Sequence, residues 1–112
     1  MTTTTFTTTL ATGEVIKGTV ECDINYWTYT PHDYARVELV GERTKLHFSR
    51  DIFRDNQVSE DLYVDTLDEQ GRVIARDLID VSGGKAHRVD LDAAGEYGEI
   101  VRRALAAVEV AA

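Results

Sequence analysis

Apolar and polar residues alternate along most of the chain as far as residue 91, and the alternation is clearest in residues 14–29. From Ile16 onward the even positions of this stretch are mainly apolar, whereas the odd positions are polar or charged as far as Asn25. Side chains on a β-strand point to opposite faces with a period of two. The pattern therefore predicts one long strand with a buried face and a solvated face.

The same alternation, interrupted by turn-forming residues, predicts several further strands. A threonine-rich segment at the N-terminus is typical of a strand at the edge of a sheet. The pattern slips near Asp77, which indicates a bulge or a bend. Residues 49–54 break the alternation and are interpreted as a short helical turn, and residues 55–61 as a polar loop. The predicted strands are residues 2–10, 14–29, 34–40, 45–49, 62–67, 72–81 and 87–91.

Residues 92–110 have helical rather than strand periodicity. Apolar side chains recur there three and four positions apart, which predicts an amphipathic helix that needs a surface to cover. The apolar face of the strands supplies that surface. We expect an α+β fold, with a curved antiparallel β-meander of about six or seven strands and one C-terminal amphipathic helix packed on it, in a single domain spanning residues 1–112.

Composition and charge narrow the classes of partner. The formal net charge is −8, and residues 57–112 carry 12 acidic and 6 basic side chains, so a negative field disfavours nucleic acid and anionic membranes. No apolar run approaches the length of a membrane span. Cys22 is the single cysteine and falls on the apolar face of its strand, which fits a core position in a reducing, cytoplasmic setting.

The clearest candidate for function is a cluster of ring side chains where residues 14–29 lead into the next strand. The polar face changes character there, from Asp23 and Asn25 to Trp27. Large rings with a polar tip bury much area at low entropic cost, so they are common at protein interfaces. The alternative is that they pack on one another and stabilise a hairpin. The candidate partner-binding residues are Tyr26, Trp27, Tyr29, His32 and Tyr34.

A second candidate is a split in charge between neighbouring segments. Residues 43–54 have a local charge of +3, and residues 55–71 contain six acids and no base. Ion pairing between adjacent strands is the simpler interpretation, and a surface that imitates nucleic-acid phosphates is the alternative. The acidic patch comprises Asp55, Glu60, Asp61, Asp65, Asp68 and Glu69.

No motif points to catalysis. The three histidines lack the close spacing of metal ligands, and the serines lack an evident base partner. We therefore expect no catalytic residues, no metal site and no cofactor, and the sequence weighs against an enzyme.

These observations favour a small acidic interaction module, of inhibitor or adaptor type, that presents the aromatic cluster to another protein. One alternative is a small-ligand carrier or enzyme with a pocket between the sheet and the helix, lined by Tyr26 and Tyr97. Another is an assembly subunit that forms homo-oligomers through a sheet edge, such as the threonine-rich strand.

Overall fold

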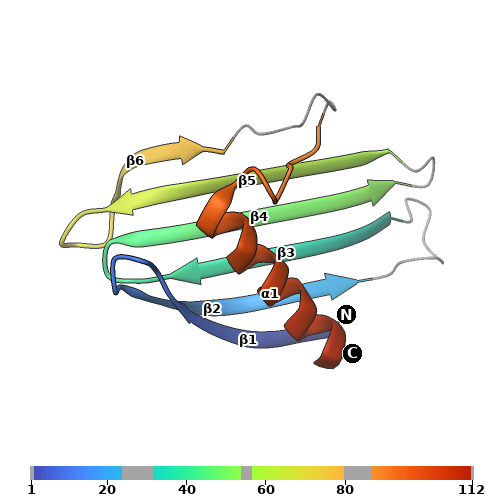
Figure 1. Cartoon of the computed structure of the whole chain (residues 1–112), viewed down its shortest axis with the longest axis horizontal. Coiled ribbons are helices and arrows are strands. Elements are labelled where there is room, and N and C mark those ends of the chain that lie inside the picture. Colours follow the sequence, from blue (N-terminus) through green and yellow to red (C-terminus); the bar gives the residue numbers. More distant parts are fainter. Residues whose placement is uncertain (1, 24–31, 54–56, 80–86, 112) are drawn as a thin grey trace.

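A computed structural model describes residues 2–23, 32–53, 57–79 and 87–111 and confirms the predicted α+β fold (Figure 1). Six antiparallel strands form one open sheet in which spatial order follows chain order, and a C-terminal helix lies across one face. The elements are β1 (Thr2–Thr9), β2 (Val15–Asp23), β3 (His32–Val40), β4 (Thr44–Phe53), β5 (Val58–Leu67), β6 (Val73–Leu78) and α1 (Gly95–Ala111).

The described reversals of the meander, after β1, β3 and β5, are short turns. Gly13 and Gly71 adopt positive φ angles of 94° and 81° in the turns after β1 and β5, a region that side chains disfavour. The threonine-rich β1 is an edge strand, as its composition predicts, and it pairs with β2 from Thr2 opposite Cys22 to Thr9 opposite Val15.

The core lies between α1 and one face of the sheet, which we call the helix face. Alternate positions of the strands supply its buried side chains, and the apolar stripe of α1 covers them. The opposite face of the sheet, called the open face, carries mostly polar and charged side chains. The fully buried apolar side chains include Ile16, Val20, Val37, Leu39, Leu46, Phe48, Leu62, Ile100, Val101 and Val108.

The helix runs diagonally over the sheet and contacts β1, β2 and β3 (Figure 1). A turn precedes the helix, and in it the Asp90 carboxylate accepts a hydrogen bond from the backbone N–H of Asp92 at 3.0 Å. Two polar contacts then join α1 to the edge strand and its turn. Glu96 accepts the backbone N–H of Ala11 at 2.9 Å, and Arg103 donates to the Thr8 hydroxyl at 2.9 Å.

The predicted helical turn at residues 49–54 is wrong, because β4 continues to Phe53 and β5 already begins at Val58. The alternation fails there because polar residues occupy positions on the helix face. Arg50 on β4 lies directly opposite Glu60 on β5, and the Arg50 Nε donates to the Glu60 carboxylate at 2.7 Å. Because Arg50 and Glu60 occupy positions on the helix face where apolar residues are expected, the hydrophobic pattern alone indicates that the strand ends there.

Two further predictions about residues 72–91 are corrected. The irregularity in the β5–β6 pairing lies beside Leu67 and Val73 and not at Asp77, and β6 is exposed along its whole length. Residues 87–91 form no strand. Val89 and Leu91 nevertheless pack against the core as the pattern predicts. In the part of the chain that the structure describes, no helix is long and apolar enough to cross a membrane.

Candidate functional site

Two members of the predicted aromatic cluster, His32 and Tyr34, lie at the start of β3, and β2 ends at Asp23. Tyr26, Trp27 and Tyr29 lie outside the described residues. The chain that carries them joins two adjacent antiparallel strands.

His32 is the first residue of β3, so this strand begins two positions earlier than the predicted residues 34–40. Tyr34 follows two positions later in the same strand. The backbone register places His32 opposite Phe53 and Tyr34 opposite Asp51, both on β4.

Tyr34 is half-buried on the open face, beside Arg36 of the same strand. The Arg36 guanidinium lies 5.0 Å from the centre of its ring, and Arg36 also pairs with Asp51 at 3.0 Å. Burial raises the pKa of the Tyr34 phenol above its usual range, and the carboxylates of Glu21 and Asp23 raise that pKa further.

Phe53 was not among the predicted site residues, and the structure places it at the same end of the sheet. Its side chain is 46% exposed at the end of β4, in the segment that the sequence pattern predicted to be a helical turn. The signal that could have found it is simple parity. Phe53 is six positions after His47, an outward residue of the same strand, so an unbroken strand places Phe53 on the open face.

The acidic segment does not form one solvated patch. Asp65 is fully buried and accepts two hydrogen bonds from Arg76, at 2.7 and 3.0 Å, which hold the pKa of its carboxyl below the usual range. Asp68 accepts two backbone N–H groups in the turn before β6. Asp61 and Glu69 are exposed, and Asp55 lies outside the described residues.

Glu60 is the most constrained acid of this segment, with a side chain only 1% exposed. Besides Arg50, it accepts the Arg88 Nε and the backbone N–H of Val89, both at 3.1 Å. The backbone N–H of Glu60 in turn donates to the carbonyl of His87 at 2.8 Å. Glu60 therefore fastens the segment before α1 to β5.

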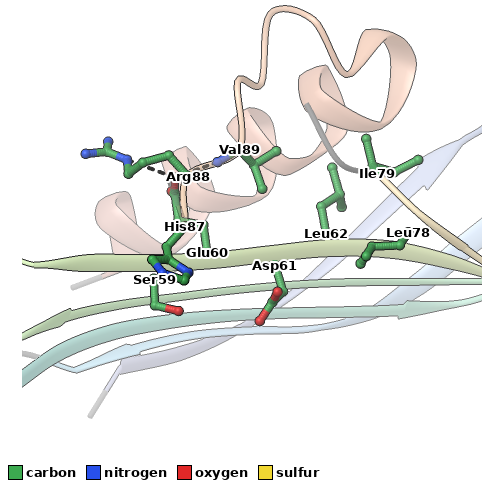
Figure 2. Close-up of a pocket in the computed structure, with 9 residues that line it drawn as sticks. All are labelled: Ser59, Glu60, Asp61, Leu62, Leu78, Ile79, His87, Arg88 and Val89. Atoms are coloured by element: carbon green, nitrogen blue, oxygen red, sulfur yellow. Dashed lines mark hydrogen bonds and ion pairs between the residues drawn. The ribbon is translucent and has the colours of Figure 1, made fainter. Parts of the chain in front are cut away.

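A cavity of about 180 Å³ lies beside this carboxylate, between β5, the end of β6 and residues 87–89 (Figure 2). Leu62 and Ile79 form its apolar side, whereas Ser59 and Asp61 point to the opposite face of β5. Because Glu60 is already satisfied by donors of the protein, the cavity has no buried polar group that requires a ligand.

A network of rings and charges on the open face was missed by the sequence reading. Glu38 contacts the Nδ1 of His47, and the His47 ring stacks on Tyr63 with 4.5 Å between ring centres. The Arg76 guanidinium covers the other side of this network, 4.1 Å from the Tyr63 ring centre. Cross-strand neighbours make it, so only the strand register could have revealed it.

A carboxylate that orients a histidine is a common part of acid–base sites. In the described ranges, however, the hydrogen bonds of His47 include no hydroxyl or thiol nucleophile. The same ranges contain no group of three or more histidine, cysteine or acidic side chains able to hold a metal ion. The network is best described as the polar packing of an uncovered sheet face.

Comparison with known proteins adds no relative. No protein-family model matches the chain, and no match was found among curated proteins or among solved structures.

Proposed function

We propose that the protein is a small interaction module, of inhibitor or adaptor type, that binds another protein through one end of its sheet. We call this surface the aromatic end; its described residues are Tyr34 and Phe53, and we propose that Tyr26, Trp27 and Tyr29 complete it. Chain connectivity supports the proposal, because residues 24–31 join the end of β2 to the start of β3.

The observation that carries the proposal is the exposure of Phe53. Six large apolar side chains of the described residues are substantially exposed, and Phe53 is the aromatic one among them. An exposed aromatic ring is suited to anchor an interface, because its burial there removes a large apolar area from water. Its register partner on β3 is His32, so Phe53 adjoins the strand that receives the aromatic segment.

The rest of the aromatic end has the character expected around such an anchor. Tyr34 offers a phenol, and Arg36 and Asp51 beside it form a paired, half-buried border. Interfaces commonly combine a few buried aromatic anchors with a polar rim of this kind.

Paired substitutions test the proposal. Phe53→Ser and Trp27→Ala each remove one ring of the aromatic end, and Ile74→Ser is a matched control because Ile74 is 60% exposed on the distant edge strand β6. Each purified protein is used as bait in lysate of the source cells, after circular dichroism confirms that it is folded. We expect a stoichiometric protein partner that is captured by the wild type and by Ile74→Ser and is lost with both ring variants.

Truncation of an interface anchor costs about 2 kcal/mol or more, which corresponds to about a thirtyfold or greater loss of affinity. A partner captured equally by all four proteins, or lost only with Ile74→Ser, would contradict the assignment of the aromatic end.

A further inference from the structure

A second cavity, of about 210 Å³, lies between the sheet and the second half of α1. Its walls are apolar on both sides, with Cys22, Ala35 and Ile52 from β2, β3 and β4, and Leu105 and Val108 from the helix. It lies between the sheet and the helix, and Tyr97 is not among the described residues that line it.

The size of this cavity suits a small organic molecule. A dry apolar cavity of about 150 Å³ is large enough to hold one benzene molecule. A volume of about 210 Å³ therefore accommodates one six-membered ring with a chain of two or three atoms.

Its charged groups favour a cation. Asp33 on β3 and Glu109 on α1 line the cavity from opposite sides, and neither makes a hydrogen bond or ion pair with another described residue. The one base in the lining, Arg50, is already paired with the buried carboxylate of Glu60. Two carboxylates thus remain to interact with a ligand.

We propose that this cavity binds a small organic cation, with an apolar ring or short chain seated between α1 and the sheet and a protonated amine beside Asp33 and Glu109. The apolar walls supply affinity by removing the ring from water, and the carboxylates select the charge. The cavity adjoins the aromatic end, because Tyr34 also lines it, but binding of the cation does not require the protein partner proposed above.

The probe is 2-phenylethylamine, compared with 2-phenylethanol and 3-phenylpropionate, which keep the ring and change the charge. Titration calorimetry at pH 7 gives the three affinities. We expect the amine to bind about fivefold more tightly than the alcohol and the carboxylate to bind most weakly, because each partly exposed ion pair contributes up to about a fivefold change.

Asp33→Asn combined with Glu109→Gln should reduce the affinity for the amine to that for the alcohol. Glu99→Gln, an exposed acid elsewhere on α1, is the matched control and should leave the affinity unchanged. Leu105→Trp should fill the cavity and abolish binding of all three probes.

The partly exposed thiol of Cys22 gives a direct measure of occupancy that needs no substitution. Saturating amine should slow the reaction of Cys22 with iodoacetamide at least fivefold. The proposal is overturned if the amine binds no better than the carboxylate, if the double variant keeps the preference for the amine, or if ligand at saturation leaves the thiol reactivity unchanged.

Discussion

Replacing Gly98 by alanine tests how closely the first turn of α1 packs against the segment that precedes it. Gly98 is buried near the start of the helix. A Cβ built at this position overlaps the carbonyl oxygen of Leu91, and it lies 2.8 Å from the Leu91 carbonyl carbon and 3.1 Å from the Ala94 Cβ. The obstacle is backbone, so no side-chain rotation relieves it.

Two effects of opposite sign then compete. Helix propensity favours alanine over glycine by about 0.8–1 kcal/mol, so a Gly98→Ala helix without this contact would gain stability. Overpacking that forces a backbone shift typically costs about 1–3 kcal/mol. Because the contact is shorter than any van der Waals separation, we expect overpacking to dominate and the free energy of unfolding to fall by about 1–2 kcal/mol.

Urea denaturation followed by far-ultraviolet circular dichroism measures this difference by linear extrapolation. Glu99→Ala is the neighbouring control, because Glu99 is exposed and its change should stay within about 0.5 kcal/mol. A Gly98→Ala variant as stable as the wild type, or more stable, would refute the close approach of α1 to Leu91.

Two further predictions concern the buried carboxylates of β5. Glu60→Ala should lower the free energy of unfolding by about 2–4 kcal/mol, because it leaves two arginines and a backbone N–H without their shared acceptor. The same urea assay measures this change, with the exposed Glu69→Ala as the control. Equal stabilities of the two variants would contradict the prediction. Arg76 lowers the pKa of Asp65, so Asp65 binds protons more weakly in the folded than in the unfolded chain. The stability that Asp65 contributes is therefore present at neutral pH and is lost as pH falls through its folded pKa. Urea titrations between pH 7 and pH 2 should therefore show that Arg76→Gln is destabilised at pH 7 and approaches the wild type in acid, and a stability difference independent of pH would count against the pair.

The sequence predicted the strands correctly where apolar side chains lie on the helix face and polar side chains lie on the open face. The strands that contain Ile16, Val37 and Leu46 bury these side chains completely, and their polar neighbours lie on the open face. The helix was located for the same reason, because Val101 and Val108 are spaced to meet one surface.

Prediction failed where polar groups face inward or where neighbours come from distant parts of the chain. Arg50 and Glu60 satisfy one another on the helix face, so a strand looked like a loop. The contact of His47 with Tyr63 depends on the β4–β5 register, which alternation alone does not specify. Phe53 was lost from the candidate site by the same misreading of β4, and the true strand places it at the aromatic end.

The central claim, that the aromatic end binds a protein, is tested most directly by photo-crosslinking from position 53. Phe53 is replaced by p-benzoylphenylalanine in the source cells, and the same analogue at Ile74 serves as the control, since both positions are substantially exposed. The account predicts one discrete crosslinked protein from position 53 and none from position 74. The same crosslinks from both positions, or a specific crosslink from position 74 alone, would contradict it.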